Sequence, residues 1–187
     1  MGSREHTGLA KPLSKKAARL MKKRQTIYDP YRDVIDQFNR NGVRYVVVGM
    51  AGVNYYGTSP KEIFATMDYD IFLDPLLYNV EKTIKVLESL GFTLSASGSA
   101  LRPERIRKTV RNRRTIIATN IHGIMVKLLL RVSGFAFSEL GRDAATFTVE
   151  GIPVRVGRLN KLLQSKKLAD RPKDRRFLKR YGSLLDE

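Results

Sequence analysis

The sequence contains no cysteine and only two histidines, His6 and His122. Disulfides, thiolate catalysis and cysteine-ligated zinc sites are therefore excluded, and the histidines are too few for a His-rich metal site. Apolar runs are short and interrupted, as in IMVKLLL at residues 124–130, so we expect no transmembrane helix and no membrane partner. The basic N-terminus lacks the apolar segment of a secretory signal. We expect an intracellular, cytoplasmic protein, with an organellar location as the alternative because this block slightly resembles a transit peptide.

Positive charge is abundant and gathers in three blocks. The net charge is +17, and residues 1–24, 102–114 and 155–180 carry +7, +6 and +9, which leaves −5 for the rest of the chain. Because a solvated surface mixes charges of both signs, this clustering indicates a polyanionic partner, with nucleic acid first. An acidic membrane surface fits less well, since the blocks lack the interleaved Trp, Phe and Leu of an interfacial helix. A merely solvated basic face is the other alternative.

The hydrophobic pattern predicts one domain after a basic extension. Residues 1–27 form the basic N-terminal extension and residues 28–187 the domain. Helices are predicted at 31–41 (opened by Asp29-Pro30), 51–57, 80–91 (capped by Asp74-Pro75), 137–144 (a short helix or turn), 159–169 and 173–185. Strands are predicted at 43–49, 67–73, 92–100 (a fragment with a loop), 122–132 and, as a hairpin turning at Glu150-Gly151, 146–156. This order predicts an α/β or α+β domain with a mixed central sheet, flanking helices, and a C-terminal hairpin plus two helices.

Two aspartates two residues apart, Asp68 and Asp70, interrupt the apolar strand ATMDYDIFLDP. Side chains two apart on a strand lie on one face, where two carboxylates repel each other unless a cation lies between them. Mg²⁺ is the usual cation, because it takes oxygen ligands and keeps waters for nucleotide phosphates. Spacing alone is weak support for a metal site, since most such pairs are surface charges at a strand end.

The surrounding motifs resemble those of the minimal nucleotidyltransferase superfamily, which has the DNA polymerase β-like fold. The matching stretches are VVVGMAGVNYYG at residues 46–57, TMDYD, KLLLRVSGFAF, and a run of the form S-K-x-x-x-x-R-x-K-D. The residues of that last run are Ser165, Lys166, Arg171, Lys173 and Asp174. The motifs are individually short, but they follow in the family's order and cover residues 30–181.

The resemblance implies roles for several residues. Asp68 and Asp70 would be the catalytic carboxylates that hold Mg²⁺, and the Gly49-Met50 loop would hold the phosphates of an NTP. Lys166 would neutralise negative charge. The implied cofactors are Mg²⁺ and an NTP if the protein is an active enzyme, and none otherwise.

Two departures from the family pattern affect this chemistry. Met50 stands where the family has the second small residue of the phosphate loop, and a bulky side chain should hinder close approach to a phosphate. Lys127 stands where the third carboxylate is expected. We hypothesise that its ammonium is a built-in cation between Asp68 and Asp70; the alternative is that Lys127 points to solvent from an edge strand.

Two classes of function remain open at this stage. In the first, the protein is a catalytically degenerate nucleotidyltransferase-fold module that binds RNA or a ribonucleoprotein assembly. In the second, it is an active Mg²⁺-dependent enzyme that moves a nucleotidyl group from an NTP to an RNA or protein acceptor. A protein partner that docks on the N-terminal extension is compatible with the first class. The candidate nucleic-acid-binding residues are Lys15, Lys16, Arg19, Lys22, Lys23, Arg24, Arg105, Arg107, Lys108, Arg111, Arg113, Arg114, Arg171, Lys173, Arg175 and Arg176.

Overall fold

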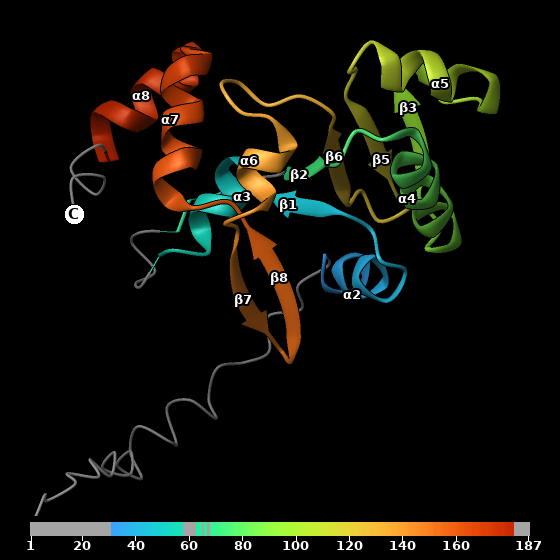
Figure 1. The fold of residues 1–187 in the computed structure, drawn as a ribbon, viewed down its shortest axis with the longest axis horizontal. Coiled ribbons are helices and arrows are strands. Elements are labelled where there is room, and N and C mark those ends of the chain that lie inside the picture. The colour runs from blue at the N-terminus through green and yellow to red at the C-terminus, as the bar shows by residue number, and fades with distance from the viewer. Residues whose placement is uncertain (1–30, 58–62, 65, 67, 182–187) are drawn as a thin grey trace, which may run out of the picture.

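The computed structural model of the chain describes residues 31–57, 63, 64, 66 and 68–181 (Figure 1). The predicted basic extension at residues 1–27, the Asp29-Pro30 helix start and the end of the last predicted helix lie outside the described residues. None of the helices in the described part is long and apolar enough to cross a membrane.

Eight strands form a mixed sheet in the order β4-β3-β5-β6-β2-β1-β8-β7. The two parallel pairs are β2 with β6 and β1 with β8, and the remaining neighbours are antiparallel. The strands are β1 (Tyr45–Val47), β2 (Tyr69–Leu73), β3 (Thr93–Ala96), β4 (Ser99–Ala100), β5 (Ile116–Thr119), β6 (Met125–Leu129), β7 (Ala145–Val149) and β8 (Ile152–Val156). The prediction of a mixed central sheet is confirmed, as is the hairpin that turns at Glu150-Gly151.

Seven helices flank this sheet within the described residues. They are α2 (Arg32–Arg40), α3 (Gly49–Asn54), α4 (Leu77–Ser89), α5 (Pro103–Arg111), α6 (Phe137–Gly141), α7 (Leu159–Ala169) and α8 (Pro172–Tyr181). The α7–α8 pair and the α4–α5 pair lie at opposite ends of the molecule, and the β7–β8 hairpin projects from its middle (Figure 1). This architecture confirms the predicted α/β domain with a mixed sheet, flanking helices and a C-terminal hairpin plus two helices.

One face of the sheet is closed by α2 and α4. The apolar residues of α2 recur at helical spacing, so Val34, Ile35 and Phe38 are all buried on one side of the helix. Phe38 meets the ring of Tyr45 on β1 edge-on, with ring centroids 5.8 Å apart. Odd-numbered residues of β2 share this buried face, because alternate side chains of a strand point the same way.

The opposite face of the sheet carries polar residues at one end and apolar residues at the other. Asp70 and Phe72 of β2 pair with Lys127 and Leu129 of β6 in parallel register. The ring of Phe137 on α6 covers Phe72, with centroids 5.5 Å apart. The Asp70 end has no such apolar cover, and the cavity described below lies there.

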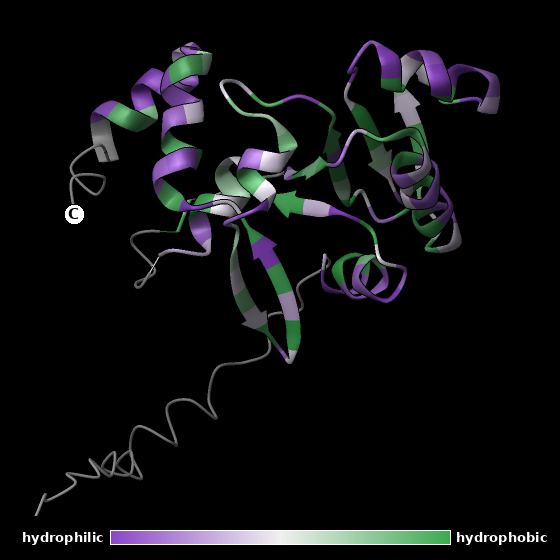
Figure 2. Cartoon of the chain, viewed as in Figure 1, coloured by the Kyte–Doolittle hydropathy of each residue, from purple (hydrophilic) through white to green (hydrophobic). Residues whose placement is uncertain are grey.

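The helix α5 and the strand β5 were not predicted; residues 102–114 were interpreted only as a basic cluster. In the structure Pro103 begins α5 and Glu104 lies in its first turn, whereas Thr109 and Val110 are buried. A proline at the first position and an acid in the first turn favour a helix start, and the high density of cations obscured this signal. Hydrophilic residues dominate this helix (Figure 2). The segment predicted as a strand fragment with a loop is the hairpin β3–β4.

The predicted helix cap at Asp74-Pro75 is also wrong. Helix α4 begins at Leu77 with no side-chain cap, and Asp74 instead pairs with Arg44 at 2.7 Å. The fully buried Asn79 forms hydrogen bonds to the start of β1 and to the end of β2. Its amide nitrogen donates to the carbonyls of Arg44 and Asp74, at 3.0 and 2.9 Å, and its Oδ1 accepts from the Arg44 backbone N–H at 2.8 Å.

We predict that Asn79→Ala lowers the free energy of unfolding by about 3 kcal/mol, because backbone groups beside a buried amide lose their partners. The matched control is Asn41→Ala: Asn41 is exposed and donates one hydrogen bond, to the Gln37 carbonyl, so its loss should stay below about 1 kcal/mol. Urea denaturation measures both. Equal losses would contradict this account of Asn79.

Candidate functional site

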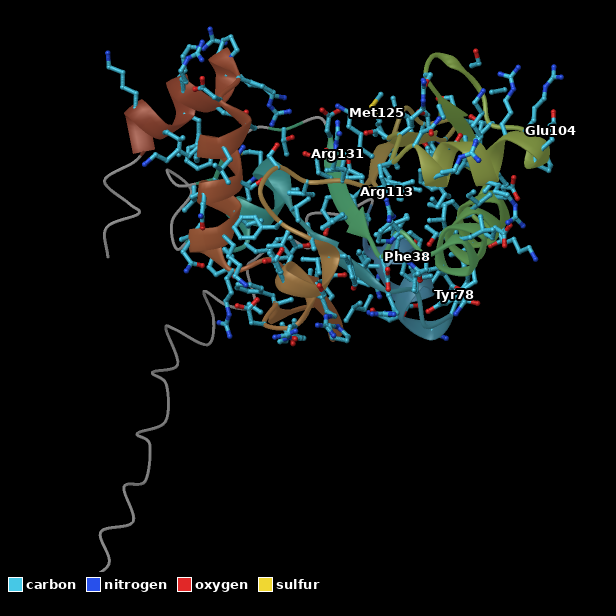
Figure 3. The ribbon with its side chains drawn as sticks, turned by 45° about the horizontal axis from the view of Figure 1, so that its top comes forward. Phe38, Tyr78, Glu104, Arg113, Met125 and Arg131 are labelled. Carbon is cyan, nitrogen blue, oxygen red and sulfur yellow. The ribbon has the colours of Figure 1, made fainter. Side chains whose placement is uncertain are left out.

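A cavity of about 640 Å³ lies between the strands β2 and β6 on one side and the helices α7 and α8 on the other. Its lining includes eight charged side chains, three acidic and five basic: Asp68, Asp70, Asp174, Lys127, Arg131, Lys166, Arg171 and Lys173. The cavity is therefore net positive. In the view of Figure 3, Arg131 lies between the α7–α8 pair and α5.

Lys127 faces the two aspartates. It lies on β6, in parallel register with Asp70 on β2, and its Nζ donates a short, charge-assisted hydrogen bond to Oδ2 of Asp68. The strand β6 is interior, between β5 and β2, so the alternative of an edge strand with a solvent-directed lysine does not describe this structure. The Lys127 side chain is 29% exposed, which leaves its ammonium accessible from the cavity.

Asp70 is held against the backbone of Gly49. Gly49 has φ +66°, and a Cβ added to Gly49 would come within 2.1 Å of Asp70 Oδ2. The carbonyl of Asp70 accepts from the Val48 N–H at 2.9 Å, so the start of α3 and the strand β2 fix each other. Burial raises the pKa of the Asp70 carboxyl, and the charge of Lys127 opposes that rise.

The α7–α8 wall is organised by a buried acid. Asp174 is 1% exposed and accepts from Arg171 Nε at 2.5 Å; Lys166 Nζ lies 3.5 Å away. Burial lowers the pKa of Lys166, against the opposing effect of Asp174. The ammonium of Lys166 also lies 5.1 Å from the centroid of the Phe177 ring. Asp174 on α8 thus holds Lys166 of α7 and Arg171 of the α7–α8 connection at the edge of the cavity.

The structure brings together residues that lie far apart in the sequence. Gly49, Met50 and both aspartates share the cavity with all five residues of the S-K-x-x-x-x-R-x-K-D run. Arg131, Thr115 and Ser133 also line the cavity, although the sequence alone did not single them out. The strand alternation that sets Lys127 and Leu129 on one face continues to Arg131 and could have identified it.

The residues present do not fit the magnesium site that the resemblance implies. Among the described residues, no three His, Cys, Asp or Glu side chains are placed to hold a metal ion. One of the two aspartates is engaged by an ammonium, which cannot be a metal ligand. Hard cations such as Mg²⁺ need several oxygen ligands, so Lys127 both removes a ligand and repels the ion.

The candidate nucleic-acid-binding residues in the described part divide into two groups. Four have internal partners: Arg113 donates to the Pro75 carbonyl, Arg114 to Ser97, Arg171 to Asp174 and Arg175 to Asp170. The other six are exposed and form no ion pair with the described residues: Arg105, Arg107, Lys108, Arg111, Lys173 and Arg176. Four of these six lie on α5. The remaining candidates, from Lys15 to Arg24, lie outside the described residues.

Comparison with solved structures finds similar chains at low sequence identity and low TM-score. The chain is similar to the Megavirus polyadenylate synthase, with 11% identity, a TM-score of 0.43, and coverage of 97% of this chain and 40% of that one. It is also similar to a candidate nucleotidyltransferase and to JHP933, both from Helicobacter pylori, each at 11% identity and a TM-score of 0.38. The coverage is 82% and 83% of this chain, and 59% and 57% of those chains. The chain therefore spans 40–59% of the length of these structures. No protein-family profile and no curated protein matches the sequence.

We predict that Gly49→Ala destabilises the fold by more than the left-handed backbone alone requires. Gly91 is the control, because its φ is +79° and a Cβ there meets nothing within 4 Å. Gly91→Ala should cost about 1–2 kcal/mol of backbone strain, and Gly49→Ala should cost at least about 1 kcal/mol more through overlap with Asp70.

The variant Asp70→Gly in the Gly49→Ala background separates the two contributions. Asp70→Gly removes the overlapping carboxylate, so Gly49→Ala should cost less free energy of unfolding in the Asp70→Gly background than in the wild type. Chemical denaturation of the wild type, Gly49→Ala, Asp70→Gly and the double variant measures this coupling. Equal costs at Gly49 and Gly91 would show that Asp70 does not press against Gly49.

Proposed function

We propose that this protein is a catalytically degenerate nucleotidyltransferase-fold module that binds RNA, free or within a ribonucleoprotein assembly. The proposal includes a cytoplasmic location and a protein partner for the basic N-terminal extension as secondary features. Two sets of residues support it. The first is the exposed cations of α5, and the second is Lys127 in the cavity.

The exposed cations of α5 carry the proposal of nucleic-acid binding. Arg107 and Arg111 are four residues apart, so they lie on one face of the helix, with Lys108 beside them. They form no ion pair with the described residues, whereas exposed arginines elsewhere, such as Arg32 and Arg40, are paired with acids. Unpaired cations clustered on one helix are available to phosphates, and the release of counterions then favours binding.

The contact of Lys127 with Asp68 supports the loss of catalysis. Two-metal nucleotidyl transfer needs carboxylates that hold the ions and stabilise the attacking and leaving oxygens. Here one carboxylate is engaged by an ammonium and the third is absent. We derive no metal-dependent step for this cavity.

The alternative function is an active Mg²⁺-dependent nucleotidyltransferase. One observation favours it: Gly49, both aspartates and Lys166 all line the same cavity, as the resemblance implies. In that case Asp68 would have to exchange Lys127 for a metal ion before each reaction.

We predict that the full chain transfers no label from labelled NTPs to total RNA or to protein in the presence of Mg²⁺, because the charge of Lys127 occupies the position of the metal. Gel autoradiography measures the transfer. Label transfer by the wild type that is lost in Asp68→Asn would establish the active enzyme and overturn the proposal of degeneracy.

We predict that the affinity for a structured RNA falls steeply with salt, and that Arg107→Gln with Arg111→Gln weakens binding. Because two phosphate contacts are removed, the slope of log K against log salt should fall by about 1–2. Fluorescence anisotropy across a salt series measures both quantities.

The matched control is Arg32→Gln with Arg40→Gln, which removes the same charge from residues already paired with Glu150 and Asp36. This variant should leave the slope almost unchanged. A flat salt response of the wild type, or equal effects of the two double variants, would contradict binding through α5.

A further inference from the structure

The lining of the cavity carries more positive than negative charge. A pocket built only to be inactive needs no surplus of cations, yet five basic side chains oppose three acids here. Lys127 contacts Asp68, and both Arg171 and Lys166 contact Asp174. The third acid, Asp70, feels the positive charges of Lys127, Lys173 and Lys166. The eight charged side chains of the lining together keep a net charge of +2.

Among the described residues, Arg131 and Lys173 are the two cations of the lining that form no ion pair. Both are exposed, and both line the cavity. They reach the cavity from different elements, because Arg131 follows β6 and Lys173 lies in the first turn of α8. Two cations of like charge that face one cavity repel each other, and an anion between them relieves this repulsion.

Lys127 adds a third donor at the floor of the same cavity. An ammonium has three N–H donors and no acceptor, and Asp68 accepts only one of them. The side chain is partly exposed and lines the cavity, so its remaining N–H groups are available to an anion bound there. Thr115, Ser133 and Ser165 line the same cavity and supply hydroxyl groups. Cations and hydroxyls are the donors that bind a phosphate.

We infer that this cavity binds the terminal phosphate of a ribonucleotide without a metal ion, with Lys127 in the role that a magnesium ion has in a metal-dependent site. Either a free mononucleotide or the phosphorylated end of an RNA strand supplies this group. The inference deepens the proposed function and rests on its absence of a catalytic metal. It does not rest on the affinity of α5 for RNA.

The experiment measures binding of three probes to the full chain by calorimetry in excess EDTA. The probes are AMP and one short single-stranded RNA prepared with a 5′-phosphate or with a 5′-hydroxyl. We expect the phosphorylated RNA to bind roughly tenfold tighter than the hydroxyl form, the factor that one charge-assisted hydrogen bond contributes. Mg²⁺ in place of EDTA should not increase this ratio.

Two variants assign the effect to the cavity. Lys127→Met keeps the length of the side chain and removes its charge, so the tenfold preference should disappear. Arg131→Gln is the second variant, because Arg131 is exposed and its loss should leave the fold intact; it should reduce the preference several-fold. The matched control is Arg142→Gln, an exposed arginine outside the cavity, which should keep the preference.

The outcomes separate this inference from the proposed function. If AMP binds and the phosphorylated RNA is preferred over the hydroxyl form, the shared phosphate chemistry is established and an RNA end is one source. If AMP binds without any preference between the RNAs, the source is a free nucleotide.

If neither AMP binding nor a preference is detected, or if either requires Mg²⁺, the inference is overturned. Salt-dependent binding of the hydroxyl RNA would then still support RNA binding through α5. Conversely, AMP binding by a protein with no affinity for RNA would contradict the proposed function and leave the cavity inference standing.

Discussion

The contact between Lys127 and Asp68 is the constraint on which the chemistry of the cavity depends. Parallel register places Lys127 opposite Asp70 on an interior strand pair, and two carboxylates on one strand face need a cation between them. A covalently attached ammonium fills that need at any metal concentration. The same ammonium cannot collect oxygen ligands, so one residue both stabilises the aspartate pair and leaves it short of the oxygen ligands that a magnesium ion needs.

The opposite wall of the cavity follows the same electrostatic principle. A buried carboxylate without partners is costly, and Asp174 avoids this cost by engaging Arg171 and Lys166. The helices α7 and α8 are thereby tied together at the cavity edge. Each wall therefore pairs an acid with a cation of its own, and Arg131 and Lys173 remain outside these pairs. We infer that the net positive charge of the cavity favours an anion, whereas a metal-dependent site is acidic until its metal binds.

Much of the fold could be predicted from the sequence, because β-branched runs and helical apolar spacing indicate most strands of the mixed sheet, β5 excepted, and most of its helices. Strand alternation and the order of the motifs also predicted that Lys127 lies close to Asp68 and Asp70. The helix α5 could not be recognised, since its buried face is only a few residues wide within a run of cations. The sequence suggests Asp74 as a helix cap because it precedes a proline. In the structure its carboxylate pairs with Arg44, a tertiary contact that the local sequence does not reveal.

The aspartate pair itself is not proof of catalysis in this fold. Once Lys127 occupies an interior strand, Asp68 is required to pair with it, since a half-buried ammonium without a partner is strongly destabilising. Gly49 is likewise explained by packing, because only a residue without a Cβ fits against Asp70 in that backbone conformation. The features that indicate a nucleotidyltransferase site in the sequence thus have structural reasons to persist without magnesium. An acid at residue 127 would complete a metal site, whereas with lysine there we infer that the cavity binds a phosphate without a metal ion.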